Sequence, residues 1–156
     1  MKYVLIIFIA ALFMSCEVMG NDTVILSDSI VAQLEKVFPI VDRMVYIDNN
    51  RSKSHYDMVS GHIAVRSQDI NNLCIMAHEM AHRWQFRQLG RVAIEYGNYY
   101  LPSGELEGLS IEQEAQVIAI LCGLRNGIAV YTEGVSYTMA DYDRLNRYAQ
   151  KYMKIF

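Results

Sequence analysis

The sequence predicts a small α+β domain that is mainly helical and contains one small antiparallel sheet. Segments 72–89 and 111–124 repeat apolar residues at helical spacing, and each is long enough for a helix of several turns. Segments 44–48 and 61–66 are short and rich in β-branched residues, which is typical of strands. The length of 156 residues suits one compact domain, and the apolar content of 53% excludes an intrinsically disordered chain.

The N-terminal segment predicts export of the chain. A basic start is followed by about a dozen apolar residues over 3–14. This pattern is typical of the apolar region of a secretory signal and is too short to span a bilayer comfortably. The segment ends in Ser15-Cys16, and a small residue directly before a cysteine resembles the lipobox of bacterial lipoproteins. Phe13 departs from that pattern, in which Leu is usual.

The lipobox resemblance implies a lipoprotein-type signal peptide over 1–15 and a lipid anchor at Cys16. The exported chain would then be tied to a membrane of the cell envelope by a tether over 16–26. A single domain over 27–156 would follow. An ordinary cleaved signal peptide and a signal anchor are the alternatives.

The charge of the chain limits the classes of partner. The net charge is −3, and no cluster of Lys and Arg interrupts the balance of charges. We therefore expect no nucleic-acid partner.

Cys74 and Cys122 lie in apolar helical patterns. They either form a disulfide in an oxidising envelope or pack as buried thiols, and the sequence leaves both open.

The first elements expected in the domain are a helix and two strands. Ser27 or Asp28 can cap a helix that runs to residue 38, where a proline follows and ends it. The two predicted strands come next, separated by a polar turn at 49–54. We expect these strands to form an antiparallel pair.

The first long helix should be largely buried. Segment 72–89 carries too many apolar residues for a surface helix, and Asp69 or Asn71 can cap it. The stretch 91–108 contains glycine and proline and predicts a surface loop.

Two further helices are expected in the C-terminal part. Ser110 can cap the helix 111–124, which we expect to end near Gly127. A final amphipathic helix is expected to start near Thr138.

The candidate chemistry begins with His78-Glu79-Met80-Ala81-His82, an HExxH motif inside the helix 72–89. Helical spacing places residues i and i+4 on one face, so His78 and His82 project side by side. Two imidazoles in this arrangement can bind one Zn²⁺ at about 2.0–2.1 Å each. Glu79 leans toward the same site, where it can act as the general base on a metal-activated water.

A catalytic zinc site needs a third protein ligand besides the two histidines. No histidine follows His82, so this ligand comes from a downstream carboxylate or an upstream histidine. Glu112 and Glu114 lie on the otherwise apolar helix 111–124 and point to different faces. The small residues on the face of Glu112 allow a second helix to approach closely, which favours Glu112. Glu114 remains the alternative.

The motif residues together resemble the gluzincins, which are HExxH zinc metallopeptidases with a glutamate as third ligand. The resemblance covers about 61–124 and rests on HEMAHRWQ at 78–85 and on the downstream Glu112-Gln113-Glu114-Ala115. It implies a minimal zincin-like domain in which the small antiparallel sheet packs on the HExxH helix. It further implies zinc ligands at His78, His82 and Glu112, a general base at Glu79, and a strand over 62–66 that borders the substrate cleft.

The function implied is that of a zinc-dependent metallopeptidase that hydrolyses peptide or protein substrates at the cell envelope. The alternative is a non-catalytic zinc-binding lipoprotein that acts as an envelope binding or assembly module. A metallohydrolase acting on a non-peptide amide is a third reading. An intact Glu79 favours the enzyme, because a structural zinc site has no use for a base.

Two further features bear on catalysis. Many relatives carry Asp after the alanine that follows the ligand glutamate, where it orients a ligand, whereas this chain has Gln116. An uncharged amide would tune the metal site less strongly. Tyr131 and Tyr137 follow the helix 111–124 and are candidates for stabilising an oxyanion, with His62 as a rival from the preceding strand.

Overall fold

The computed structural model describes residues 22–57, 60–89, 111–132, 135–148 and 150. The predictions of a signal peptide, of the anchor at Cys16, of the loop at 91–108 and of the Ser110 cap fall outside these ranges. No helix in the described ranges is both long enough and apolar enough to cross a membrane.

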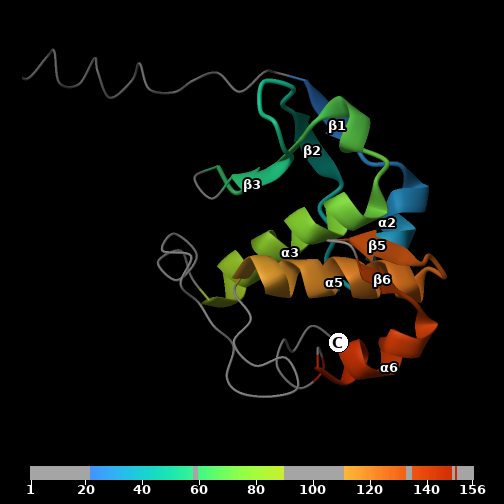
Figure 1. Ribbon diagram of the computed structural model, residues 1–156. Coiled ribbons are helices and arrows are strands. Elements are labelled where there is room, and N and C mark those ends of the chain that lie inside the picture. Colours follow the sequence, from blue (N-terminus) through green and yellow to red (C-terminus); the bar gives the residue numbers. More distant parts are fainter. Residues whose placement is uncertain (1–21, 58–59, 90–110, 133–134, 149, 151–156) are drawn as a thin grey trace, which may run out of the picture.

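The described residues form a small mixed sheet packed on helices, so the prediction of a mainly helical α+β fold is confirmed. Helix α3 (Leu73–Leu89) packs against the sheet, and α5 (Ile111–Arg125) lies along the other side of α3. The two helices run roughly antiparallel (Figure 1). The short helix α2 (Asp28–Leu34) contacts α3 as well.

The sheet has four strands in the order β1-β2-β4-β3. Their bounds are Thr23–Ile25 for β1, Met44–Ile47 for β2, His55–Asp57 for β3 and His62–Val65 for β4. The prediction of an antiparallel β2–β4 pair is wrong, because these strands are parallel with Tyr46 opposite Ala64. Parallel neighbours need a crossover connection. Strand β3 is part of this connection, because the chain first forms the edge strand β3 and then returns antiparallel to it as β4.

The chain joins the sheet earlier than predicted. Strand β1 pairs antiparallel with β2, with Thr23 opposite Tyr46 and Ile25 opposite Met44. Leu26 is buried in the core. The tether predicted over 16–26 is therefore wrong for its last residues, which belong to the domain. Three residues are too few to show strand alternation in a sequence.

The start of α3 is tied to the end of β4. Asn72 caps the helix, because its Oδ1 accepts a hydrogen bond from the Ile75 N–H at 3.2 Å. Of the residues predicted to cap, Asp69 instead ends a 3₁₀ turn (Ser67–Asp69) and is buried. Its carboxylate accepts bonds from Arg66 Nε at 2.7 Å and Ser54 Oγ at 2.8 Å, and the Arg66 bonds lower the pKa of Asp69.

The end of α5 near Gly127 is as predicted. The N–H of Gly127 bonds to the Leu124 carbonyl at 3.0 Å, and the N–H of Ile128 bonds to the Gly123 carbonyl at 2.9 Å. This is a Schellman motif, and it needs a left-handed residue at Gly127, whose φ is 72°. The motif turns the chain back along the helix.

Beyond α5 lies a hairpin that the sequence did not predict, formed by β5 (Val130–Thr132) and β6 (Val135–Tyr137). Helix α6 (Met139–Tyr148) then begins beside Thr138, as predicted. The Thr138 Oγ1 accepts a hydrogen bond from the Ala140 N–H at 3.3 Å.

The core is built mainly by α3 and α5. As predicted, α3 is largely buried through its apolar face, and α5 is buried on nearly all sides after its first turn. The fully buried residues of these two helices include Met76, Ala77, Ala81, Ala115, Ile118 and Leu121. Alanines at the contact allow the two helix backbones to approach closely, which brings polar side chains of both helices within reach of each other.

Gly123 allows β5 to pack directly on α5. A Cβ placed on Gly123 would collide with Cγ2 of the buried Val130. We expect Gly123→Ala to lower the free energy of unfolding by about 1–2 kcal/mol, because overpacking outweighs the gain in helix propensity. Urea denaturation measures this change. In Gly123→Ala/Val130→Ala the loss should be smaller than the sum of the single losses, and strict additivity would contradict the clash.

Candidate metal centre

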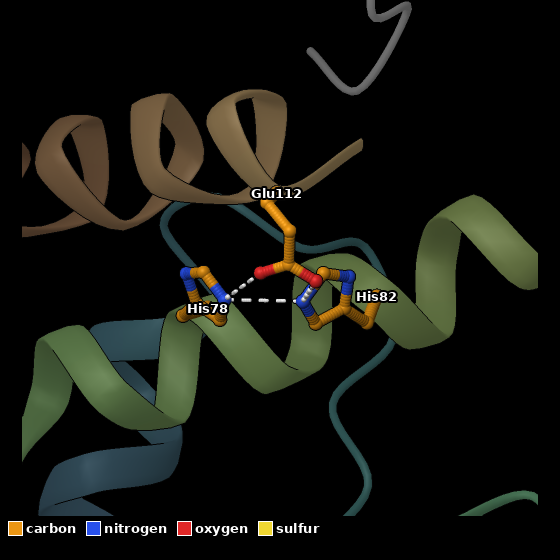
Figure 2. A group of neighbouring side chains, drawn as sticks. All are labelled: His78, His82 and Glu112. Atoms are coloured by element: carbon orange, nitrogen blue, oxygen red, sulfur yellow. Dashed lines mark hydrogen bonds and ion pairs between the residues drawn. The ribbon is translucent and has the colours of Figure 1, made fainter. Parts of the chain in front are cut away.

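The three predicted metal ligands come from facing surfaces of α3 and α5. His78 and His82 lie one helical turn apart on α3, and Glu112 lies in the first turn of α5. Figure 2 shows the Glu112 carboxylate reaching across to both imidazole rings, with one oxygen toward each. The structure therefore brings together all three residues that the sequence singled out.

The distances between the ligand atoms suit a single ion. His78 Nε2 and His82 Nε2 are 3.0 Å apart, and the Glu112 oxygens lie 3.3 Å and 3.4 Å from them. Zinc–ligand bonds of about 2.0–2.1 Å in a tetrahedron place ligand atoms about 3.3 Å apart. Two imidazole nitrogens and a carboxylate oxygen are also donors that zinc accepts in catalytic sites. The residues present thus fit a zinc ion in both chemistry and spacing.

The charges of the site also favour metal binding. Hydrogen bonds from His78 and His82 lower the pKa of Glu112 well below its usual range, so this carboxylate is ionised at neutral pH. Burial alone would lower the pKa of His82, but the neighbouring Glu112 raises it overall. Metal binding requires an ionised carboxylate and neutral imidazoles, so a cation would compete with the proton that Glu112 favours on His82.

Glu79 lies beside this cluster in a buried position. Its side chain is only 6% exposed, and burial raises the pKa of its carboxyl group although both histidines oppose that shift. A backbone hydrogen bond from Tyr56 on β3 also reaches the carboxylate. The edge strand that the sequence did not predict therefore helps to hold the predicted base.

Glu114, the alternative third ligand, lies away from the cluster. It is buried, and its Oε2 accepts a hydrogen bond of 2.6 Å from Nε2 of Gln85, which is also fully buried. Gln85 Oε1 lies 2.9 Å from Nδ1 of His82. Of the two candidate acids, Glu112 is the one beside the histidines. The contact between Gln85 and Glu114 was missed by sequence reasoning.

A cavity of about 480 Å³ opens next to the cluster, and His78 and Glu79 form part of its wall. One side of the cavity is polar and is made by residues before β3, after β4 and before α3. The other side is more apolar and is made by α3 and by the chain around β5. Its lining comprises Lys53, Ser54, Arg66, Asp69, Asn72, Cys74, Ile75, Gln116, Ala129, Val130 and Tyr131 besides the two site residues.

The cavity distinguishes among the remaining candidates for stabilising an oxyanion, which are Tyr131, Tyr137 and His62. Tyr131 lines it, whereas Tyr137 is partly buried against the core. His62 packs its ring on Tyr46, with centroids 4.6 Å apart, and is not among the lining residues. Among the described strands, β4 is an interior strand of the sheet and β3 is the edge strand near the site. Of the segment 62–66 that was expected to border a cleft, only Arg66 does so.

Cys74 and Cys122, the cysteines among the described residues, are free thiols in this structure. Cys122 is buried in α5, and Cys74 is partly buried and lines the cavity. Burial raises the pKa of both thiols, to about 12 for Cys122. Neither thiol is therefore ionised at neutral pH, which argues against a role as nucleophile.

Comparison of the chain with protein-family models, curated proteins and solved structures returns no match. The resemblance to gluzincins accordingly rests on the motif residues at 78–85 and 112–115.

Proposed function

We propose that the protein is a zinc-dependent metallopeptidase. The observation that carries the proposal is the convergence of His78, His82 and Glu112, which offer one ligand atom each within 4.8 Å of one another. A buried carboxylate, Glu79, follows the first ligand directly and lines the same cavity as His78. Three ligands and an adjacent base are the parts that zinc-assisted hydrolysis requires.

Each residue then has a distinct role. His78, His82 and Glu112 would hold the ion, which when bound lowers the pKa of water and polarises a substrate carbonyl. Glu79 would take the proton from the attacking water onto its carboxylate. Burial raises the pKa of Glu79 toward neutrality, and a base with a pKa nearer the working pH transfers protons more efficiently.

The cavity suits a peptide substrate in size and character. Its volume of about 480 Å³ lies within the usual range of about 300–1,000 Å³ for ligand sites. The polar side offers donors and acceptors for a peptide backbone, and Ile75 and Val130 offer apolar contacts for a side chain. Tyr131, on the wall of this cavity, is our candidate for the hydroxyl that stabilises the oxyanion. The N-terminal pattern supports the further proposal that this activity is located at the cell envelope, through a lipid on Cys16.

The test is metal content and hydrolysis by the full chain purified in detergent. We expect about one zinc per chain, and we expect cleavage of peptides in a fluorescence-quenched library. Removing the metal with a chelator should abolish cleavage, and adding zinc back should restore it. A folded chain without zinc would overturn the proposal. Stoichiometric zinc with no cleavage of any peptide would instead favour the non-catalytic envelope module.

A further inference from the structure

A line of hydrogen bonds leads from His82 into the core, away from the cavity. His82 Nδ1 lies 2.9 Å from Gln85 Oε1, and Gln85 Nε2 donates to Glu114 Oε2 at 2.6 Å. Gln85 is 0% exposed and Glu114 is 1% exposed. Burying an amide and a carboxyl group between apolar helices is unfavourable unless each group finds a partner. Here Gln85 and Glu114 are partners of each other, and the line begins at His82, which is a candidate metal ligand.

Glu114 sets the direction of the Gln85 amide. Because the carboxyl oxygen of Glu114 accepts, the amide must turn its NH₂ group toward Glu114 and its oxygen toward His82. An oxygen facing Nδ1 requires a hydrogen on Nδ1. The lone pair of the neutral ring then lies on Nε2, which is the atom that faces His78 and Glu112. This is the tautomer that can bind the ion.

We propose that Gln85 and Glu114 are positioning residues that fix the tautomer and the orientation of His82 for metal binding. Gln116, which directly follows Ala115, lines the cavity instead. In this chain the function is served by a pair that spans α3 and α5. The inference rests on the proposed zinc site, but it does not depend on peptide hydrolysis.

The sharpest test exchanges the two side chains. In Gln85→Glu/Glu114→Gln, the new carboxylate at position 85 can accept from the His82 Nδ1–H, and the new amide at position 114 can donate to that carboxylate. Composition, charge and nearly all volume are conserved. Gln85→Leu removes the acceptor, and Gln85→Glu alone brings two buried carboxyl groups together. We expect both single variants to lower zinc affinity by about 10–100-fold and the exchanged pair to recover most of it.

Zinc affinity is measured by competition with a chromophoric chelator, and the cobalt(II) absorption spectrum reports the geometry of the ligands. A spectrum that changes in Gln85→Leu and returns in the exchanged pair supports positioning. Unfolding in the presence of a chelator reports stability without metal. If the single variants lose only this stability and keep wild-type zinc affinity, Gln85 and Glu114 merely join the helices and the inference is overturned.

Leu145→Ala is the control for lost stability, because Leu145 is buried on α6 and belongs neither to the cavity lining nor to the histidine cluster. We expect it to lower the urea midpoint of unfolding of the metal-free protein and to leave zinc affinity unchanged. A fall in affinity equal to that of Gln85→Leu would show a general effect of lost stability and would count against positioning.

A second measurement separates this inference from the proposed function. Nitrogen-15 NMR of metal-free Glu112→Ala, in which no carboxylate competes for a proton on Nε2 of His82, reports which nitrogen of the neutral ring carries the proton. In this background we expect Nδ1–H with the native Gln85 and Glu114 and with the exchanged pair, and a mixture in Gln85→Leu. His82 protonated on Nε2 beside the native Gln85 and Glu114 would overturn the positioning inference. Correct tautomers, together with a wild-type chain that cleaves no peptide, would contradict only the peptidase.

Discussion

Glu79→Gln is expected to retain about one zinc per chain and to lose peptide hydrolysis by about 10²–10⁴-fold. The carboxylate is buried beside His78, and Gln has nearly the same shape, so the packing and the Tyr56 contact to the side chain should survive. The amide cannot take a proton from water. The loss should therefore appear in kcat, with little change in KM.

The measurements are zinc content and steady-state kinetics on the best substrate of the peptide library. Gln113→Ala is a suitable control, because Gln113 is exposed in the first turn of α5 and lies outside the cavity lining. Unchanged kcat in Glu79→Gln would remove Glu79 from the mechanism. Loss of zinc in this variant would show that the carboxylate acts through the metal site instead.

Glu112→Ala is expected to lower zinc affinity by at least about 100-fold, more than the loss of a residue that only orients a ligand. Two histidines then remain, one fewer than the protein ligands of a catalytic zinc site. Glu112 is 75% exposed, so its removal leaves no cavity in the core and the fold should persist.

Competition with a chromophoric chelator gives the affinity, and circular dichroism confirms the fold. Gln113→Ala again serves as the control from the same helical turn. Zinc affinity that stays at the wild-type value in Glu112→Ala would contradict the ligand set. Glu114 would be a poor substitute, because its carboxyl group is turned to Gln85.

The long helices and the side-by-side placement of His78 and His82 could be predicted because their information is local. HExxH spacing alone places His78 and His82 on one face of a helix. The choice of Glu112 followed from its small neighbours, and of these Ala115 and Ala119 are buried, at 0% and 1% exposure.

The sheet could not be predicted in the same way. Strands β1, β3, β5 and β6 have three residues each, which is too short for a periodic pattern. The sequence did not predict β3. The connection expected between the two predicted strands was therefore a polar turn, and a short turn joins antiparallel neighbours. Strand direction is set by pairing across the sheet, which local sequence does not record.

The hydrogen bond between Gln85 and Glu114 could not be predicted from the sequence for a related reason. The two residues are 29 positions apart, and their contact depends on how closely α3 and α5 pack. One signal was present: Glu114 shares a helix face with apolar residues, and a carboxyl group there needs a buried partner. Gln85, one turn after His82, was available, but nothing local links the two positions.

The ligands of the proposed ion are divided between two helices, and this division ties the metal to the lifetime of the protein. Glu112 stands thirty residues after His82 in the chain, so a bound ion would close the intervening stretch into a loop. Binding would then stabilise the α3–α5 pair by about 4 kcal/mol when free zinc exceeds its dissociation constant a thousandfold. A chain in zinc-poor surroundings would then be easier to degrade as well as without its proposed activity, so that metal supply would govern how much of the protein persists.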